Sequence, residues 1–316
     1  MQNLQKPVSS DLEHCAVAGG ATGLQFCGWP DTLPRMLGFS IVNLIVPERE
    51  FEVPSAFGTW LFQRSPIYDQ AFPEVEERGA CANTFEARIE FDLRARTNEE
   101  FIAACDEIIV AGLILSWLTA KCITVRQTVP DCDVQFAAVG DHFLPARGIV
   151  GFSPLERTVD LTRLLQPGLP HFQNIIQARR LKLMLCHWLS GLTCFTLEDL
   201  FINTCVEMDV VKQCEIVVAG RTLTYYNGMV EASRRFNLVR LNQDYQEMRN
   251  DLLHYGVLSG TNLPGKTKAQ CAEIVADTLN WIDRYVGAVL GFGPTVGANP
   301  RWSGPRVGLP SFSNPA

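Results

Sequence analysis

Hydrophobic and polar residues alternate along residues 84–96, TFEARIEFDLRAR, in the pattern of a β-strand with one buried face. Short apolar segments broken by Gly and Pro between residues 14 and 60 indicate further strands and turns. Residues 122–129 and 133–139 are also predicted to be strands. Together with one long helix, these strands predict a mixed α+β domain over residues 1–150.

That helix is predicted over residues 98–120, with Asn98 as its N-cap and two glutamates in its first turn. It contains the longest apolar run of the chain, Ile108–Leu118. Eleven apolar residues are too few to span a bilayer, so we expect this run to be a buried helix core.

After Asp160, apolar residues recur every three or four positions, which is the spacing of helices that bury one face. Residues 169–192 are predicted to form one helix, and Thr196 to cap the start of another. A closing helix over residues 266–289 carries one broad apolar stripe. The predicted fold class is therefore α+β, in which an all-α helical bundle over residues 155–290 follows the mixed domain.

Residues 291–316 are rich in Gly, Pro, Ser and Asn, so no packed element is expected in this tail. Within it, Arg301, Trp302 and Phe312 are candidates for docking onto a partner or a second subunit. Without such a partner, the tail is predicted to be disordered.

The composition is that of a soluble globular protein, with 47% hydrophobic and 19% charged residues. A net charge of −7 and a pI of about 5.3 argue against a protein that coats nucleic acid non-specifically. Arginine outnumbers lysine 21 to 6, which suits local recognition of phosphate groups better than bulk attraction. An enzyme that acts on a presented RNA remains compatible with this charge.

The 11 cysteines are spread along the chain without any CxxC pair, and several lie within apolar helical runs. We therefore expect free thiols, no structural metal site and no cofactor. The chain begins with the polar residues MQNLQKPVSS, which do not resemble a signal peptide. These features predict a cytoplasmic protein without a membrane partner.

Residues 245–256, YQEMRNDLLHYG, carry the clearest candidate chemistry. Their apolar positions follow helical spacing, and Gly256 can adopt the left-handed conformation that ends a helix. Arg249 and His254 are separated by four residues, and Asn250 directly follows the arginine. A guanidinium offers phosphate a fixed fork of donors, and an imidazole can exchange a proton near neutral pH. This helix end is therefore the candidate active site.

The segment RNDLLHYG, followed by a loop and a helix, resembles the HEPN superfamily, in which an R-x(4–6)-H motif marks metal-independent ribonucleases. The resemblance extends over residues 155–290, and the arrangement behind a different N-terminal domain is similar to that of ApeA-type anti-phage defence proteins. It implies an endoribonuclease of toxin or defence type, and a homodimer in which two such motifs meet. A protein trigger or antitoxin is a further implied partner, and residues 1–150 would then be a sensor or regulatory domain.

In this interpretation, the 2′-hydroxyl of the RNA attacks the neighbouring phosphate and leaves a 2′,3′-cyclic phosphate and a 5′-hydroxyl. His254 would act as general base or acid, and Arg249 would neutralise the charge that develops on the phosphate. Asn250 would orient the phosphate or the imidazole. Tyr255 and Lys266 are candidate substrate-binding residues.

Helix geometry qualifies this assignment. Residues four apart share a face of a helix, whereas residues five apart point about 140° away from each other. Asn250 and His254 are therefore predicted to be neighbours, while Arg249 points elsewhere. A frayed helix end or a second copy of the chain is needed to bring the arginine and the histidine together. Asp251 is expected to be a solvent-facing charge.

Two alternatives stay open from the sequence. Residues 260–267, GTNLPGKT, match the P-loop pattern G-x(4)-G-K-[ST], but they follow a predicted helix instead of a buried strand. A P-loop NTPase is therefore the weaker alternative. The stronger one is a catalytically inactive HEPN-like scaffold that binds RNA, a nucleotide or a protein partner.

Overall fold

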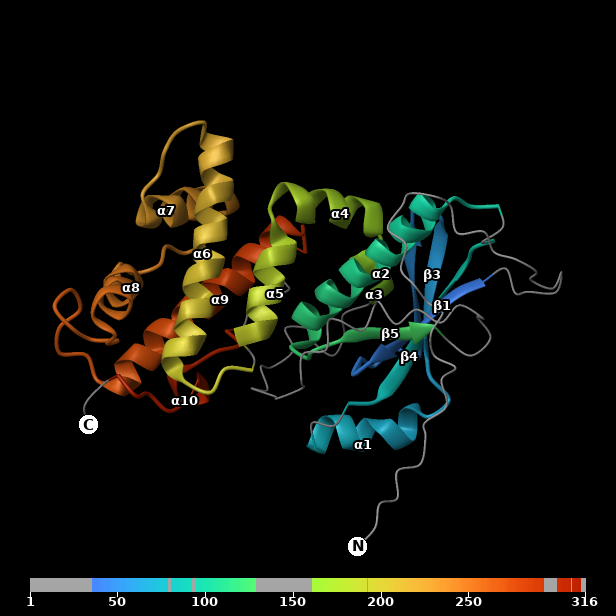
Figure 1. Cartoon of the computed structure of the whole chain (residues 1–316), viewed down its shortest axis with the longest axis horizontal. Coiled ribbons are helices and arrows are strands. Elements are labelled where there is room, and N and C mark those ends of the chain that lie inside the picture. The colour runs from blue at the N-terminus through green and yellow to red at the C-terminus, as the bar shows by residue number, and fades with distance from the viewer. Residues whose placement is uncertain are drawn as a thin grey trace, which may run out of the picture. The chain divides into compact units, whose positions relative to one another are not determined.

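Five strands form one antiparallel sheet in the order β2-β3-β4-β1-β5 (Figure 1). The computed structural model describes residues 36–78, 81–92, 95–128, 161–191, 193–292, 300–307 and 309–313, and all elements named below lie within them. The strands are β1 (Met36–Val42), β2 (Glu50–Ser55), β3 (Gly58–Arg64), β4 (Asn83–Glu90) and β5 (Thr124–Thr128). The helices are α1 (Tyr68–Arg78), α2 (Asn98–Thr119), α3 (Leu161–Leu165), α4 (Leu169–Ala178), α5 (Leu181–Gly191), α6 (Leu197–Ala219), α7 (Tyr225–Phe236), α8 (Asp244–Tyr255), α9 (Lys268–Val289) and α10 (Gly304–Val307).

The alternating segment forms β4, whose apolar side chains are buried and whose polar side chains on the opposite face are partly exposed. On the polar face, Glu86 and Arg88 form an ion pair at 2.8 Å. The strand is shorter than the predicted residues 84–96, because its pairing with β1 extends only to Glu90. The strand predicted at residues 122–129 is confirmed as β5.

β2 and β3 form a hairpin closed by the two-residue turn Ala56–Phe57. The buried carboxylate of Glu107 in α2 accepts hydrogen bonds from the Ala56 N–H at 2.9 Å and the Trp60 indole N–H at 3.3 Å. The Ser55 hydroxyl donates to the same carboxylate. One acidic side chain therefore fixes the tip of the hairpin to α2.

α2 is the long apolar helix expected from the sequence, but its N-cap is Thr97 and not Asn98. Thr97 has an extended backbone, and it exchanges hydrogen bonds with Glu100 in a capping box. α2 is long and apolar enough to cross a membrane, yet 61% of its most apolar stretch is buried inside the protein. It is thus packed like the core helix of a soluble protein, as predicted for its apolar run.

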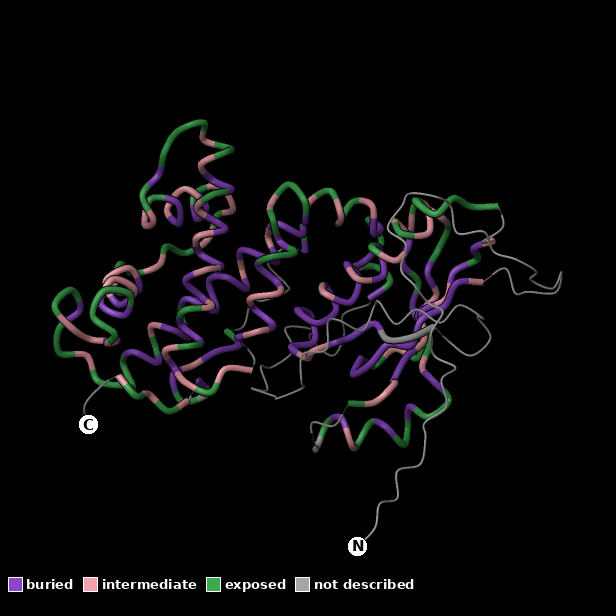
Figure 2. Tube along the Cα trace, in the orientation of Figure 1, coloured by how far each residue is buried: buried purple, intermediate pink, exposed green. Residues whose placement is uncertain are grey.

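The single helix predicted over residues 169–192 is two helices, α4 and α5. Arg180 between them has a φ of +52°, a left-handed conformation that interrupts the helix. α5 packs on α6, which also contacts α7, α8 and α9. Buried residues line the sides on which these helices face one another (Figure 2). Thr196 caps α6 as predicted, because its hydroxyl accepts a hydrogen bond from the Asp199 N–H at 3.1 Å.

Two features hold α7 against α6. The buried Glu215 carboxylate of α6 pairs with Arg179 at 2.9 Å and with Arg235 of α7 at 2.8 Å. The two helices also approach closely at Gly228, where an added Cβ would lie 2.9 Å from the Cα of Lys212. No larger residue fits at this crossing without moving the helices apart.

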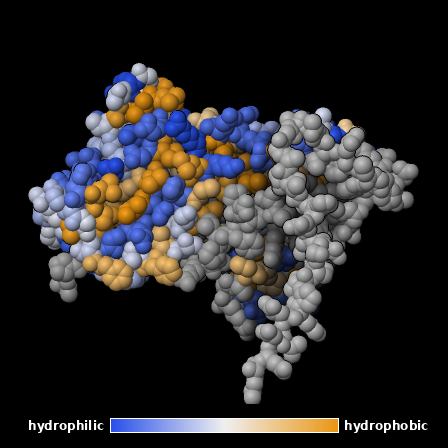
Figure 3. Space-filling view, in the orientation of Figure 1, coloured by the Kyte–Doolittle hydropathy of each residue, from blue (hydrophilic) through white to orange (hydrophobic). Residues whose placement is uncertain are grey.

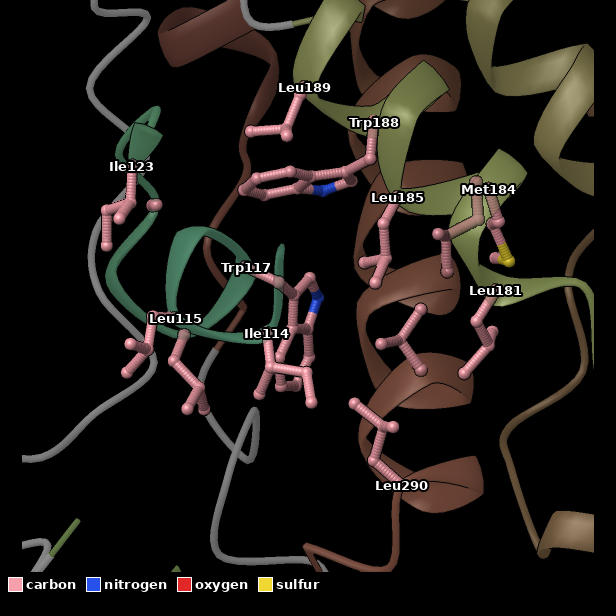
Figure 4. Close-up of a cluster of buried hydrophobic side chains, with 14 of the residues drawn as sticks. Ile114, Leu115, Trp117, Ile123, Leu181, Met184, Leu185, Trp188, Leu189 and Leu290 are labelled. Atoms are coloured by element: carbon pink, nitrogen blue, oxygen red, sulfur yellow. The ribbon is translucent and has the colours of Figure 1, made fainter. Parts of the chain in front are cut away.

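A buried carboxylate on α9 joins segments that are far apart in the sequence. Asp283 accepts hydrogen bonds from the indole N–H of Trp117 in α2 at 3.0 Å and from that of Trp302 at 2.9 Å. Arg301 lies 3.5 Å from the same carboxylate and donates to the Trp117 carbonyl at 2.7 Å. Burial raises the pKa of Asp283, and the positive charge of Arg301 opposes that increase. The Trp117 ring lies among apolar side chains of α5, Trp188 included (Figure 4).

Part of the tail predicted to be disordered is packed against the rest of the chain. Arg301 and Trp302 are buried, and the Trp302 backbone exchanges hydrogen bonds with the Asn280 side chain at 2.9 and 3.0 Å. Residues 304–307 form the short helix α10, which contacts α9. The prediction was wrong because a few large side chains find their partners within the same chain, despite the surrounding Gly and Pro.

The end of the tail is bound to the start of α6. One carboxylate oxygen of Glu198 accepts hydrogen bonds from the Ser311 and Ser313 hydroxyls, both at 2.6 Å, and from two backbone N–H groups at 3.0 Å. Partial burial opposes ionisation of Glu198, but these hydrogen bonds lower its pKa to about 2. Phe312, a predicted docking residue, remains 81% exposed.

The described residues belong to one compact unit, and buried apolar residues from Leu37 to Val307 belong to one cluster. The predicted class, α+β, is confirmed, since an antiparallel sheet with helices precedes a helical region. The domain boundary expected near residue 150 and the strand expected at residues 133–139 lie outside the described residues.

Replacement of the buried carboxylate tests its contribution to the fold. Asp283→Asn should lower the free energy of unfolding by about 3–5 kcal/mol, because the buried Arg301 loses the charge of this carboxylate and two buried indole N–H groups lose a charged acceptor. Urea denaturation followed by tryptophan fluorescence measures this loss. Glu231→Gln removes a pair with the exposed Arg234 and should leave the free energy of unfolding nearly unchanged. Equally small losses in both variants would contradict this role of Asp283.

Candidate functional site

The Arg249–His254 motif lies on α8, which contacts α6 and α9. Tyr245, Met248 and Leu252 form the buried side of this helix. The helix ends at Gly256, as predicted, with a φ of +72° and an N–H that donates to the Leu252 carbonyl at 3.0 Å. The end of α8 is therefore a well-formed helix terminus.

Arg249 points toward α6 and α7. Its guanidinium carbon lies 4.4 Å from the centre of the Tyr225 ring, and its Nη2 lies 3.5 Å from the Asp209 carboxylate. The Arg249 side chain is 24% exposed, and its Nε is buried without a hydrogen-bond partner in the described part of the chain. Stacking and one long ion pair hold the guanidinium, so some of its donors stay available.

His254 is exposed to solvent at the end of α8. Its neighbours Leu253 and Tyr255 are 50% and 62% exposed, and the His254 and Tyr255 rings lie 6.3 Å apart. Asn250 is partly exposed one turn earlier, on the helix face predicted to carry His254. Over the helical region, hydrophobic and hydrophilic residues are intermixed on the surface (Figure 3). The imidazole, the amide and the Tyr255 ring are thus accessible to a ligand.

One copy of the chain does not bring Arg249 and His254 together. In the described residues, no hydrogen bond or ring contact joins the two side chains, and the arginine contacts α6 and α7 while the histidine faces solvent. This arrangement agrees with the 140° expected between residues five apart on a helix. A site that uses both groups must combine two copies or rearrange this helix end.

Asp251 was expected to face solvent, but its carboxylate is buried. It accepts hydrogen bonds from the backbone N–H groups of Gly260, Asn262 and Leu263 at 2.8–2.9 Å, and from the Asn262 side chain at 2.7 Å. Burial raises the pKa of Asp251, but these donors outweigh burial and leave the pKa below its ordinary value. Asp251 therefore fixes the loop after α8 to the helix turn that carries His254.

Lys266 lies at the opposite end of α8 from His254. Its Nζ pairs with Asp244 at 2.9 Å, and Asp244 precedes His254 by ten residues, or about 15 Å along a helix. In this conformation Lys266 does not contribute to the surface around His254.

The loop of residues 260–267 does not have the surroundings of a P-loop. Helix α8 precedes it, and three of its backbone N–H groups bind the Asp251 carboxylate. Thr267 caps α9 in a capping box with Gln270. The amide groups that a P-loop would offer to phosphate are therefore occupied by a side chain of the protein.

A cavity of about 600 Å³ lies beside the start of α8. Its walls come from the connection between α7 and α8, from α9 and from Pro300, and they include Lys266. Arg249 and His254 do not line it. This cavity and the motif are thus separate features of the helical region.

Sequence reasoning did not find Asp209, Tyr225 or the structural role of Asp251. Asp209 and Tyr225 reach Arg249 from α6 and α7, so only tertiary packing brings them to the motif. The burial of Asp251 had one local signal, the Gly260–Leu263 stretch, which supplies free backbone N–H groups shortly after the helix. Within the described residues, no group of three or more His, Cys, Asp or Glu side chains is placed to hold a metal ion.

Comparison with known proteins gives no relative. No protein-family model, no curated protein and no solved structure matches this chain.

Loss of the Asp251 carboxylate should loosen the end of α8. Asp251→Asn replaces an acceptor of four hydrogen bonds and should lower the free energy of unfolding at pH 7 by about 2 kcal/mol. Because folding lowers the pKa of Asp251, the carboxylate stabilises the protein fully above its ordinary pKa of 3.8 and less as the pH falls further.

Denaturation curves of both proteins at pH 7 and pH 3 check this prediction, and their difference should shrink at the lower pH. Asp244→Asn on the same helix removes only a surface pair and should change stability by less than about 1 kcal/mol. A pH-independent difference between wild type and Asp251→Asn would show that the charge of Asp251 is not responsible.

Proposed function

We propose that this chain is a metal-independent endoribonuclease of toxin or anti-phage defence type, with a HEPN-like helical bundle over residues 155–290. The observation that carries the proposal is the C-terminal half of α8, where an exposed imidazole and a guanidinium with unused donors lie on one helix. The Asp251 hydrogen bonds support it, because they hold this helix end in place without occupying His254.

In the proposed reaction, the 2′-oxygen of the RNA forms a bond to phosphorus, and the bond to the 5′-oxygen breaks. His254 takes the proton from the 2′-hydroxyl or gives one to the departing 5′-oxygen. Arg249 stabilises the charge on the phosphate oxygens, and Asn250 orients the phosphate or the imidazole. Tyr255 offers an exposed ring on which a base can stack.

The proposed enzyme acts as a homodimer, because Arg249 and His254 diverge on one helix. A second copy, packed through the helical region, would place its histidine at the arginine of the first. Residues 1–150 would sense a trigger or bind an antitoxin. We place the protein in the cytoplasm, since the eight cysteines among the described residues are all free.

A non-catalytic scaffold that binds RNA, a nucleotide or a protein is the second candidate. One observation favours it, namely that Arg249 contacts Asp209 and Tyr225 instead of His254. A P-loop NTPase has less support, because Asp251 already binds the loop amides and Asp244 pairs with Lys266. It would require magnesium-dependent ATP hydrolysis that Lys266→Ala abolishes.

Cleavage of bulk RNA in the presence of EDTA tests the proposed chemistry. His254→Ala and Arg249→Ala should each lower the rate by about 100-fold or more, because each removes a group that acts on the transition state. His171→Ala and Arg234→Ala replace an exposed histidine and an exposed arginine of other helices and should keep wild-type rates. Absence of cleavage by wild type would leave the scaffold as the function, and cleavage that survives both motif substitutions would exclude Arg249 and His254 as the active site.

Mixing the two inactive variants tests the shared site. If each site combines Arg249 of one copy with the histidine of the other, random exchange of subunits should restore about a quarter of wild-type activity. The cleavage assay, repeated after incubation of the mixture, measures the recovery, and each variant incubated alone is the control. A mixture as inactive as its components would mean that one copy supplies both groups.

A further inference from the structure

Asp209 sits between two cations, Arg249 and Lys212. Its carboxylate lies 3.1 Å from the Lys212 Nζ and 3.5 Å from the Arg249 Nη2. Asp209 and Lys212 are on α6, three residues apart, whereas Arg249 reaches them from α8. The Asp209 side chain is 39% exposed, so the carboxylate lies at the surface and a dissolved ligand can reach its position.

The contact between Asp209 and Arg249 is longer than the two arginine pairs of Glu215. Arg179 and Arg235 approach the Glu215 carboxylate to 2.9 and 2.8 Å, which are normal distances for charge-assisted hydrogen bonds. At 3.5 Å the Asp209 carboxylate engages one end of the Arg249 fork without such a bond. Asp209 therefore balances the charge of the guanidinium, but some N–H donors of Arg249 make no hydrogen bond.

The Arg249 guanidinium is nevertheless held against an aromatic ring. The Tyr225 ring stacks beneath it at 4.4 Å, and the Tyr225 hydroxyl donates to the Cys205 carbonyl at 3.3 Å. A planar fork with unused donors and a neighbouring ammonium group matches a phosphodiester, which presents two charged oxygens. The Asp209 carboxylate, which lies between the same two cations, resembles a phosphodiester because both are anions that accept hydrogen bonds.

We propose that the Asp209 carboxylate occupies a phosphate-binding position made by Arg249, Lys212 and the Tyr225 ring, and that a phosphodiester of an RNA strand displaces it. This inference rests on the proposed function for the identity of the ligand. It assigns Lys212 and Tyr225 as further substrate-binding residues, and it makes Asp209 an internal competitor that lowers the affinity of the free chain for RNA.

Binding of a short fluorescein-labelled 2′-O-methyl oligoribonucleotide, measured by fluorescence anisotropy in EDTA, tests the proposal. This probe has no 2′-hydroxyl and cannot be cleaved by the proposed reaction. Asp209→Asn should lower its Kd by about two- to five-fold, as expected for removal of a competing surface charge. Lys212→Met should raise the Kd by a similar factor, and the gain from Asp209→Asn should disappear when Arg249→Met is added.

Glu231→Gln is the matched control, because it removes one negative charge and releases Arg234 on the neighbouring helix, while Arg235 keeps its pair with Glu215. It should leave the Kd unchanged. An equal gain from Glu231→Gln, or no gain from Asp209→Asn in a variant whose denaturation curve shows a folded protein, would overturn the proposal. So would a gain that persists in the Arg249→Met background.

Competition with inorganic phosphate and with a ribonucleoside 5′-monophosphate distinguishes the two possible ligands, a phosphodiester of an RNA strand and a free phosphate group. If the ligand is a strand, each small molecule should displace the labelled strand only at a concentration far above the Kd of that strand. Thermal stabilisation of the protein by free phosphate, without binding of the strand, would overturn this assignment. The binding result is independent of cleavage. Tighter binding by Asp209→Asn with no RNA cleavage by wild type would refute the proposed enzyme and retain the site, while cleavage with unchanged binding would refute only this inference.

Discussion

The buried Asp283 carboxylate is the group on which the arrangement of the helical region depends. It takes hydrogen bonds from Trp117 on α2 and Trp302 in the tail, and its charge is balanced by Arg301. A buried charge is costly unless it is paired and hydrogen-bonded. The folded state is therefore stable only when α2, α9 and the tail lie together around this carboxylate. Apolar packing supplies much of the driving force, but this polar network specifies which helix and which stretch of tail meet.

The candidate site inherits its geometry from that framework. α9 carries Asp283 on its buried side and also supports α8, so the helix with the motif rests on a helix whose position is specified internally. α8 then presents two different surfaces. On one, Arg249 is held by α6 and α7, and on the other, His254 is open to solvent. This division is the physical reason for a composite site.

The sequence predicted those features that depend on interactions between residues close together in the chain. The buried alternation of β4, the capped start of α6 at Thr196 and the helix end at Gly256 each depend on residues close in sequence. The contacts of Asp251, Asp209 and the tail depend on partners brought from elsewhere, so no periodicity reveals them. The cap of α2 was misplaced by one residue because Thr97 and Asn98 are both good capping residues, and only the backbone decides between them. In the candidate site, the positions of His254 and Gly256 followed from the helix, whereas the surroundings of Arg249 did not.

The close approach of α6 and α7 at Gly228 has a consequence for charge as well as for packing. The hydrogen-only side chain at this position rests against the backbone and the first carbons of Lys212, the residue whose ammonium group stands beside Asp209. A bulkier residue at position 228 would shift the stem of the lysine and carry its cation away from Arg249. Gly228 therefore determines both the spacing of α6 and α7 and the position of the Lys212 charge beside Asp209.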